Sequence, residues 1–376
     1  MTFPLPPNSV IGLVGGGQLG RMSALAAARL GYRCHILTRE ADSPAAQVAH
    51  GVTISDYADP ASLRAFAEQV DVISFEFENV SAEGLDLLAS IKPVRPSPAV
   101  LRVSQDRLVE KQFLNDAGVP TTAWAMVSTR EELADAARRI GLPAILKTTR
   151  YGYDGKGQAR LMKPDHLSPA FAKLSPKPLI LEGFVDFAAE ISVIVARGSD
   201  GALVAFDTVE NRHRDHVLDL TFAPARVSDD AIGQSQSIAR RIATALDVVG
   251  VLAVEMFVDA QGRVLANEIA PRPHNSGHWS IEACPASQFE MHIRAIAGLP
   301  LPAGTRHADA VMRNLVGPED MALWPEILAT PGLIPHLYGK AEARPRRKMG
   351  HVTRLFPKGA LPGEHGIAAV LGKLAR

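Results

Sequence analysis

Two acidic side chains, Glu255 and Glu268, flank a segment whose residue types favour a turn. Apolar runs lie on both sides of residues 259–262 (DAQG), so the pattern predicts a β-hairpin. With a two- or four-residue loop, we expect Glu255 opposite Ala266, with Glu268 diagonal to Glu255 on the same face. Diagonal neighbours lie roughly 7–8 Å apart, and Mg²⁺ shared with phosphate oxygens would offset their repulsion. A solvated hairpin face carrying two unrelated acids is the alternative.

A lysine and a glycine-rich loop form a second candidate site. Lys147 ends the apolar run AILK, and the loop GYDGKGQ follows at residues 152–158. Glycines let backbone amides approach phosphate oxygens closely, and the loop also carries Lys156. No G-K-[ST] opens a helix here, so the loop is not a Walker A motif. The pattern favours a phosphate-binding flap over a solvated hairpin tip.

An N-terminal glycine turn has two interpretations. Residues 15–20 (GGGQLG) follow an apolar strand and open a helix, and Glu40 lies about 20 residues on. This spacing matches the dinucleotide-binding fingerprint, so an NAD-dependent oxidoreductase remains an alternative. Because such turns recur in many α/β domains, we favour a small anion or phosphate at the helix N-terminus, without a nicotinamide cofactor.

Two further segments suit a polar ligand. The strand at residues 179–185 (LILEGFV) breaks at Glu-Gly, where a free backbone edge could pair with adenine, and Glu190 could accept ribose hydroxyls. Residues 274–278 (HNSGH) follow Pro273. Zinc binding by the two histidines would need a helix, which Pro273 and Gly277 disfavour, so hydrogen bonding to a small molecule is expected.

A basic cluster near the C-terminus has three interpretations. It consists of Lys340, Arg344, Arg346, Arg347 and Lys348. A solvated surface is the usual outcome for such runs, and a substrate phosphate is the functional alternative. Nucleic acid ranks third because aromatic residues do not interleave with the charges.

The order of apolar runs predicts the elements that position these groups. Strands at 10–14, 33–38 and 71–77 alternate with helices at 18–30, 60–69 and 81–90, which indicates parallel βαβ units. A helix at 106–117 leads to an α+β lid over about 120–185. Long strands, a helix at 228–246 and a β-rich tail with strands near 333–338 and 351–356 follow.

Bulk composition narrows the class of protein. A chain of 376 residues is too long for a single hydrophobic core of ordinary size. Its 40 basic residues balance its 40 acidic residues, so no net electrostatic field favours binding to nucleic acid or to a membrane surface. No signal peptide or membrane span is expected. The only cysteines, Cys34 and Cys284, lack a catalytic pattern, and we expect packing roles in a reducing cytoplasm.

Together the motifs resemble the ATP-grasp superfamily, and in particular the carboxyaminoimidazole ribonucleotide synthase family of purine biosynthesis. The resemblance rests on GGGQLGRM at 15–22, FEFENV at 75–80, GYDGKGQ at 152–158, LEGFV at 181–185 and NEIAPRPHNSGHW at 267–279. Arg107 on the linking helix also matches, whereas the proline-bearing N-terminal extension has no assigned part.

The resemblance implies an ATP-grasp fold of mixed α/β and α+β class. It implies a Rossmann-like, parallel-sheet pre-ATP-grasp domain at 1–110 and an ATP-grasp domain at 111–300. The latter would contain a mobile lid at about 120–185 and a central antiparallel sheet. A small β-rich C-terminal cap at 301–376 would complete the substrate site.

The resemblance also implies ligands for particular residues. Metal binding by Mg²⁺, with Mn²⁺ as an alternative, falls to Glu255, Glu268 and Asn267. The remaining ATP-site positions are Arg107, Lys147, Gly152, Tyr153, Asp154, Gly155, Lys156, Gly157, Gln158, Glu182, Gly183, Phe184, Val185, Glu190 and His213. Substrate contacts fall to Gln18, Glu76, His274, Asn275, Ser276, Lys340 and Arg347. Catalytic roles fall to Arg272, Tyr153 and Asp154.

The implied reaction is the ATP-dependent carboxylation of aminoimidazole ribonucleotide by bicarbonate, through carboxyphosphate, in a cytoplasmic homodimer without nucleic-acid or membrane partners. Two alternatives besides the oxidoreductase stay open. Another ATP-grasp ligase acting on an amino acid or peptide would need no basic phosphate clamp near residues 340–348. A non-catalytic nucleotide-binding regulator would bind ATP without substrate-stimulated phosphate release.

Overall fold

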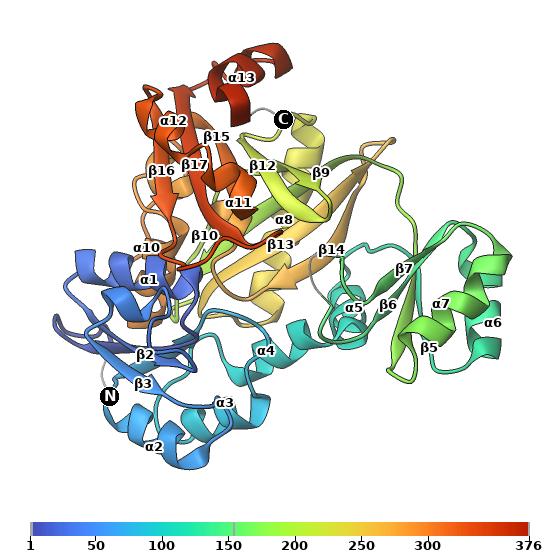
Figure 1. Ribbon diagram of the computed structural model, residues 1–376. Helices are drawn as coiled ribbons and strands as arrows, with labels where there is room; N and C mark the ends of the chain where they lie inside the picture. Colours follow the sequence, from blue (N-terminus) through green and yellow to red (C-terminus); the bar gives the residue numbers. More distant parts are fainter. Residues whose placement is uncertain (1–2, 153–154, 375–376) are drawn as a thin grey trace.

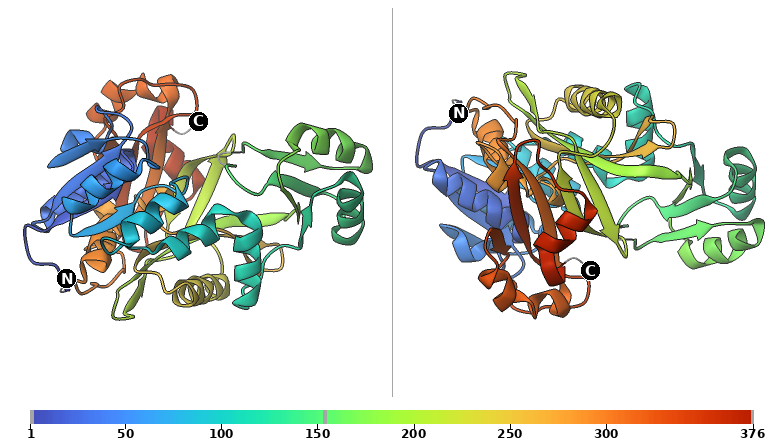
Figure 2. Two further views of the ribbon diagram at one scale, coloured as in Figure 1. Left: turned by 90° about the horizontal axis from the view of Figure 1, so that it is seen from below. Right: turned by 90° about the horizontal axis from the view of Figure 1, so that it is seen from above.

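The computed structural model describes residues 3–152 and 155–374. Figure 1 shows an N-terminal lobe, a central sheet that runs into the C-terminal segment, and a lid lobe that projects from one side. The two further views in Figure 2 show the same projection of the lid. Within the described residues, no helix combines the length and apolarity needed to cross a bilayer.

The N-terminal lobe is a parallel sheet covered by helices, as predicted. Its order is β3-β2-β1-β4, and its strands are β1 (Val10–Val14), β2 (Arg33–Thr38), β3 (Gly51–Ile54) and β4 (Val72–Phe75). The helical segments of this lobe are α1 (Gln18–Arg29), η1 (Ala46–Val48), α2 (Pro60–Glu68) and α3 (Ala82–Ala89). Strand β3 was not predicted, because its alternating GVTI is short and half-exposed.

Two helices connect this lobe to the rest of the chain. α4 (Pro98–Gln105) ends at Asp106, whose side chain accepts a hydrogen bond from the Leu108 amide and caps α5 (Arg107–Asp116). The predicted helix at 106–117 is therefore confirmed, and α4 precedes it. The Asp106 cap fixes the N-terminus of α5, so Arg107 occupies its first turn.

The lid is a four-stranded sheet with two helices packed on it. Its strand order is β5-β8-β6-β7. The strands are β5 (Trp124–Val127), β6 (Ala144–Thr148), β7 (Gln158–Leu161) and β8 (Leu179–Gly183). The helical segments are α6 (Arg130–Ile140), η2 (Pro164–His166) and α7 (Leu167–Leu174). β6 and β7 form a hairpin whose connection contains the glycine-rich loop.

The central sheet is antiparallel and joins the middle of the chain to its C-terminus. Its order is β14-β13-β9-β11-β12-β15-β17-β16, with β10 paired to β9. The bounds are β9 (Phe187–Arg197), β10 (Leu203–Ala205), β11 (Val209–Arg214), β12 (Val217–Ala223), β13 (Gly250–Asp259), β14 (Val264–Ala270), β15 (Ala308–Val316), β16 (Leu333–Leu337) and β17 (Lys348–Pro357). The C-terminal segment is β-rich, as expected, and its strands extend this sheet.

Helices cover this sheet and join it to the N-terminal lobe. They are α8 (Asp229–Ala245), η3 (Asn275–Gly277), α9 (Ser280–Ala283), α10 (Gln288–Ala297), α11 (Gly317–Met321), α12 (Trp324–Ala329), α13 (Glu364–Leu371) and η4 (Gly372–Leu374). α10 packs against α1, and Ile293 and Ile296 share a buried cluster with Ile11 and Ile36. The predicted helix at 228–246 is confirmed, with Ser228 accepting from the Ala231 amide as its cap.

The N-terminal extension lies in the seam between these lobes. Leu5 is buried in the same cluster, and its amide donates to the Ala297 carbonyl at 2.8 Å. The Tyr32 hydroxyl donates to the Leu5 carbonyl at 2.9 Å. The guanidinium of Arg95 lies over the Phe3 ring. The extension therefore contributes to the core between α1 and α10.

Candidate active site

The two acidic residues of the hairpin face each other directly. Glu255 pairs with Glu268, and the register shifts before Met256, which pairs with Ala266. The prediction that Glu255 lies opposite Ala266 is therefore wrong. The turn is wider than expected, because the Asp259 carboxylate accepts from the amides of Gln261 and Arg263 at 2.9 Å each. Val258 then pairs with Val264, and a bulge at Asn267 adds one more residue.

Each of these carboxylates lies against a basic side chain. Glu255 Oε1 lies 2.9 Å from His274 Nε2, and Glu268 Oε2 lies 3.3 Å from Arg107 Nη1. Burial alone would raise the pKa of Glu255, but the charge and hydrogen bond of His274 outweigh it and lower this pKa to about 2. Glu255 is therefore ionised at neutral pH, and the opposed pair presents negative charge on one face of the hairpin.

The pair fits a divalent cation that also binds phosphate. Among the described residues, no cluster of three or more His, Cys, Asp or Glu side chains could hold a metal ion by itself. The opposed carboxylates and the adjacent Asn267 therefore supply only part of a coordination shell. Mg²⁺ is commonly held by one or two carboxylates together with substrate phosphates. The donor set is thus suited to Mg²⁺ that arrives with a nucleotide.

Arg107 links the acidic pair to the glycine-rich loop. Its Nη1 contacts Glu268, and its Nη2 donates to the Gly152 carbonyl at 3.1 Å. Gly157 has a φ of +71°, and a Cβ there would lie 2.7 Å from Thr148 Oγ1, so only glycine fits. The predicted roles of Tyr153 and Asp154 lie outside the described residues. The loop therefore begins beside the guanidinium that contacts Glu268.

Two lysines surround a buried carboxylate at the base of the lid. Glu182 is 3 % exposed, lies 2.7 Å from Lys147 Nζ and lies 4.0 Å from Lys111 Nζ. Burial alone would raise the pKa of Glu182, but the two ammonium groups outweigh it and lower this pKa to about 2. The Glu182 side chain thus orients Lys147. The predicted contact of residues 182–185 with adenine would therefore be made by their backbone.

The predicted ribose and nucleotide-site residues lie together on neighbouring strands. Glu190 on β9 lies across from Asn211 on β11, and a bulge follows before His213. His213 Nδ1 lies 2.7 Å from Glu190 Oε2. Burial would lower the pKa of His213, but the hydrogen bond to Glu190 and its charge raise it overall. The two residues form one polar group on the sheet face that also carries Glu255.

Glu76 fills the N-terminal glycine turn. Its carboxylate accepts from the Gly20 amide at 2.6 Å and from the Gly17 amide. These amides would bind the phosphate of a dinucleotide in the oxidoreductase alternative. The expectation of a free anion or phosphate in this turn is therefore wrong, because a carboxylate of the chain itself satisfies the helix N-terminus.

Basic residues from distant parts of the chain lie near Glu76. The charges of Arg272 and Lys340 both act on its carboxylate. Arg272 Nη2 lies 2.6 Å from Glu78, and Lys340 Nζ donates to the Lys348 carbonyl at 2.6 Å. Burial and the charge of Arg347 lower the pKa of Lys340 to about 8. The end of β4, the segment after β14 and the C-terminal segment therefore share one polar region.

The 274–278 segment is held in place by Gln288 of α10. Gln288 Oε1 accepts from the His274 amide at 2.8 Å, and its Nε2 donates to the His274 carbonyl at 2.6 Å. Ser276 Oγ lies 2.9 Å from His274 Nδ1 and accepts from Ser192 Oγ at 2.7 Å. Both polar atoms of the Asn275 side chain are buried without a hydrogen-bond partner. A buried, unsatisfied amide of this kind suits a polar ligand.

The remaining predicted positions are divided between this region and the surface. Gln18 is the first residue of α1, at the glycine turn that the Glu76 carboxylate fills. Arg347 donates to the Glu342 carbonyl at 2.9 Å. Arg344 pairs with Glu342, and Arg346 donates to the Asp215 carbonyl. The basic cluster thus separates into Lys340, Arg347 and Lys348, which are half-buried and close enough for their charges to act on site residues, and the exposed Arg344 and Arg346.

Several residues of the site were not predicted. Glu78, Lys111, Gln288 and Ser192 contact predicted site residues through side chains. Glu78 stood inside the FEFENV motif, so a charged residue two positions after Glu76 was a usable signal. The others lie in ordinary helix or strand patterns, and only the fold brings them to the site.

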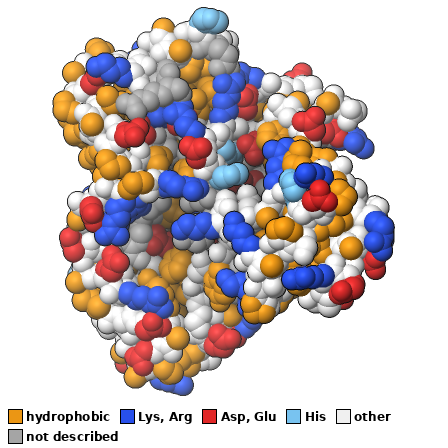
Figure 3. Space-filling model, turned by 45° about the vertical axis from the view of Figure 1, so that its right-hand side comes forward, with side chains coloured by type: hydrophobic (Ala, Val, Ile, Leu, Met, Phe, Trp, Pro, Cys, Tyr) orange, Lys and Arg blue, Asp and Glu red, His pale blue; other side chains and the backbone are white. Residues whose placement is uncertain are grey.

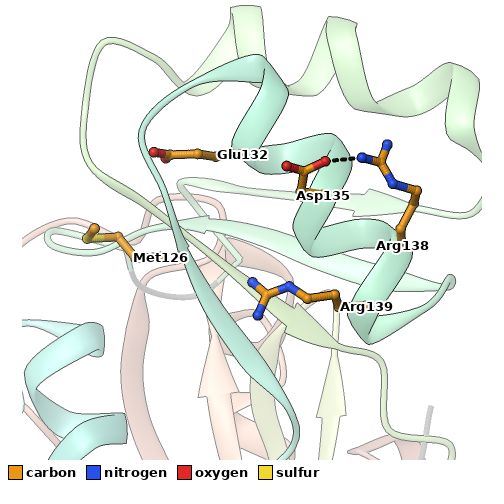
Figure 4. Close-up of a pocket in the computed structure, with 5 residues that line it drawn as sticks. All are labelled: Met126, Glu132, Asp135, Arg138 and Arg139. Atoms are coloured by element: carbon orange, nitrogen blue, oxygen red, sulfur yellow. Dashed lines mark hydrogen bonds and ion pairs between the residues drawn. The ribbon is translucent and has the colours of Figure 1, made fainter.

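The surface is hollowed where these elements meet. Figure 3 shows Lys and Arg side chains gathered around a hollow, with histidine and acidic side chains inside it. A separate pocket of about 450 Å³ lies on the lid, between β5 and α6, and is lined by Met126, Glu132, Asp135, Arg138 and Arg139 (Figure 4). It contains none of the predicted site residues, and its charges are of both signs.

The fold and site define the class of protein. Residues 112–289 match the family model of the ATP-grasp domain, and residues 9–105 match that of the ribonucleotide synthetase preATP-grasp domain. Residues 310–360 match the phosphoribosylaminoimidazole carboxylase C-terminal domain. The chain is therefore an ATP-grasp protein, with the ATP-binding architecture of that class.

Individual relatives identify the family within this class. The chain is 50 % identical to the N5-carboxyaminoimidazole ribonucleotide synthase of Brucella melitensis, over 94 % of this chain and 98 % of the relative. A solved N5-carboxyaminoimidazole ribonucleotide synthetase with ADP superposes with a TM-score of 0.94 at 37 % identity, covering 99 % and 98 % of the two chains. The Aspergillus clavatus enzyme, complexed with ADP and 5-aminoimidazole ribonucleotide, gives 0.90 at 33 %, covering 98 % and 97 %. The chain belongs to the N5-carboxyaminoimidazole ribonucleotide synthase family.

Proposed function

We propose that the chain carboxylates 5-aminoimidazole ribonucleotide with bicarbonate at the expense of ATP, in purine biosynthesis. The products are 5-(carboxyamino)imidazole ribonucleotide, ADP and phosphate. One observation carries the proposal: Glu255 and Glu268 face each other, and Arg107 links this pair to the glycine-rich loop. This arrangement brings metal-binding oxygens and a phosphate-binding loop to one place, as γ-phosphoryl transfer requires.

The chemistry follows from the poor reactivity of bicarbonate. Its hydroxyl is not a leaving group, so an oxygen of bicarbonate attacks the γ-phosphorus of ATP and ADP departs. The exocyclic amine of the substrate then bonds to the carbon of carboxyphosphate, directly or after release of CO₂. Phosphate leaves, and the amine loses one proton. The enzyme's contribution is positioning and charge neutralisation.

The residues divide these tasks by position. Mg²⁺, or Mn²⁺ in its place, would be held by Glu255, Glu268 and Asn267 and would neutralise phosphate charge. Arg107 and Lys147 contact ATP phosphates beneath the 152–158 loop, including Gly155, Lys156 and Gln158. Adenine lies against the backbone of Gly183, Phe184 and Val185, and the ribose lies beside Glu190 and His213.

The second substrate occupies the polar region around Glu76. Gln18, Glu76, His274, Asn275 and Ser276 surround aminoimidazole ribonucleotide and bicarbonate. Arg272 acts on the reacting groups together with Tyr153 and Asp154. The phosphate of the ribonucleotide binds Lys340 and Arg347. The buried Asn275 amide, which lacks a hydrogen-bond partner, supports this assignment because it needs a polar ligand, and the half-buried ammonium of Lys340 supplies positive charge beside Glu76.

Phosphate release tests the proposal directly. The wild-type enzyme should release phosphate from ATP when aminoimidazole ribonucleotide and bicarbonate are both present. Glu255→Gln and Glu268→Gln keep the shape of each side chain but remove a negative charge, so phosphate release should fall by about a hundredfold or more while the circular dichroism spectrum is retained. Near-normal turnover in both variants would reject the metal assignment.

Assembly and location extend the proposal. We expect a homodimer in the cytoplasm, as the family resemblance implies. Light scattering of the purified chain measures its mass directly. A single species at the mass of one chain, at micromolar concentration, would contradict the dimer.

A further inference from the structure

The metal-binding hairpin lies at the edge of the central sheet. β14 is the terminal strand, so within residues 3–152 and 155–374 one side of its backbone pairs with no other strand and makes only an isolated bridge to Thr121. Edge groups that are buried need other hydrogen-bond partners. The Ala266 amide donates to the Pro120 carbonyl at 2.8 Å, which leaves the groups around Glu268 to be satisfied from elsewhere.

Two consecutive residues of α5 supply those partners. Lys111 Nζ donates to the Asn267 carbonyl at 2.6 Å, and Glu110 Oε1 accepts from the Ile269 amide at 2.7 Å. The anchored backbone groups belong to the residues immediately before and after Glu268. The two side chains therefore hold the strand on both sides of the carboxylate.

The burial of both side chains is unusual for charged residue types. Glu110 is 2 % exposed and Lys111 is 1 % exposed. Burying such groups is costly unless each is paired and hydrogen-bonded. Among the described residues, neither side chain forms a hydrogen bond or an ion pair with the carboxylate of Glu255 or Glu268. Their hydrogen bonds go to the backbone at the bulge.

The bulge explains why such anchoring is needed. At Asn267 the register of β13 and β14 shifts, so the regular ladder is interrupted beside Glu268. A strand that is both bulged and at a sheet edge has fewer backbone bonds to fix its path. The position of the Glu268 carboxylate relative to Glu255 then depends on the contacts from α5.

We propose that Glu110 and Lys111 form a backbone clamp that positions Asn267 and Glu268 for the metal ion. They are positioning residues, because they act through the strand and touch neither substrate nor metal. Lys111 also lies 4.0 Å from Glu182, which pairs with Lys147 of the lid. The clamp therefore connects the metal-binding strand to the phosphate-binding lysine. This inference rests on the metal assignment made above.

Calorimetry of ADP binding, with Mg²⁺ and with EDTA, tests the clamp without relying on turnover. Lys111→Met removes the donor to the Asn267 carbonyl, and Glu110→Leu removes the acceptor for the Ile269 amide. Each variant should lower the ratio of the Mg²⁺ to the EDTA affinity by about tenfold, the scale seen when partners behind a metal ligand are removed. Binding of ADP in EDTA should change much less.

Matched variants separate positioning from general destabilisation. Leu88→Ala removes a buried side chain of α3, in a core cluster that contains no residue of α5, β13 or β14, so the ratio should stay at the wild-type value. Glu110→Gln retains an oxygen acceptor and should recover most of the loss seen in Glu110→Leu. If Lys111→Met does not fold, the Glu110 pair still decides the question.

The outcomes distinguish the clamp from the function beneath it. If the wild-type chain binds ADP with the same affinity in Mg²⁺ and in EDTA, the metal assignment is overturned and the clamp with it. A wild-type chain that responds to Mg²⁺, with unchanged ratios in Glu110→Leu and Lys111→Met, would overturn the clamp alone. An equal loss in Leu88→Ala would show that the effect is a general destabilisation and would also overturn the clamp.

Discussion

Lys340 shows how burial tunes a single residue of the site. Its ammonium donates to the Lys348 carbonyl, and it lies where burial and the charge of Arg347 lower its pKa to about 8. Part of this shift is offset by Glu76, whose negative charge favours the protonated form. A lysine poised near neutral pH binds a phosphate while protonated and loses that ability only slightly above the physiological range.

The pH dependence of substrate capture follows from this pKa. As pH rises through about 8, Lys340 loses its charge in the free enzyme, so kcat/KM for aminoimidazole ribonucleotide should fall. Lys340→Arg keeps its charge at all accessible pH values, so that decline should disappear. Steady-state rates measured from about pH 6.5 to about pH 9.5 give the pH profile of kcat/KM. An unchanged decline in Lys340→Arg would assign the titration to another group.

At the scale of elements, α5 organises the nucleotide side of the site. One short helix supplies Arg107, Glu110 and Lys111, which reach the glycine-rich loop, the acidic pair and the bulge of β14. Its start is fixed by the Asp106 cap, so a shift of this helix would move all three contacts together. The lid and the central sheet thus meet through side chains of one element.

Arg107→Lys tests this link between the loop and the acidic pair. Lysine keeps the charge but cannot reach both Glu268 and the Gly152 carbonyl with a planar fork. The KM for ATP should rise by about tenfold, equivalent to roughly 1.4 kcal/mol, while the KM for aminoimidazole ribonucleotide changes little.

Arg102→Lys is the matched control for this variant. Arg102 of α4 forms a surface ion pair with Asp86 of α3, outside the site. Its replacement by lysine should therefore leave both Michaelis constants unchanged. Equal changes in the two constants for Arg107→Lys would indicate a general disturbance of the fold.

At the scale of the whole molecule, the seam between lobes is a continuous apolar core. Leu5 of the extension, Ile11 and Ile36 of the N-terminal sheet, and Ile293 and Ile296 of α10 are buried in one cluster. The region proposed to bind the substrate lies across the same seam, since Glu76 and Arg272 come from its two sides. The relative position of the lobes therefore determines how Glu76 and Arg272 lie with respect to each other.

Leu5→Ala tests the contribution of the extension to this core. Removing a fully buried leucine side chain should lower the free energy of unfolding by about 2–4 kcal/mol, through lost burial and a residual cavity. Denaturant unfolding followed by fluorescence measures the change. Leu25→Ala, at a side chain on α1 that is 51 % exposed, should change it by about 0.5 kcal/mol or less. Equal effects would show that the extension does not support the core.

Periodicity and turn residues predicted most of the elements, and tertiary contacts explain the exceptions. The helices at 18–30, 60–69 and 81–90 are confirmed because their apolar faces and stop signals are local. β11 was not predicted, since its VENRHR sequence is polar and only its place between β9 and β12 stabilises it. The pairing of Glu255 with Glu268 was missed by two positions, because a side chain in the turn and a bulge set the register.

The residue types of the sequence determined the class of chemistry: two acids on one hairpin, a lysine before a glycine-rich loop, and a polar segment behind the second acid. These features are local, so spacing along the chain suffices to recognise them. Only the tertiary structure decided that Glu76 fills the glycine turn, that Glu182 orients Lys147, and that α5 anchors the bulge. Those contacts join residues 35 to 159 positions apart, and they depend on how packed lobes meet, which no local pattern encodes.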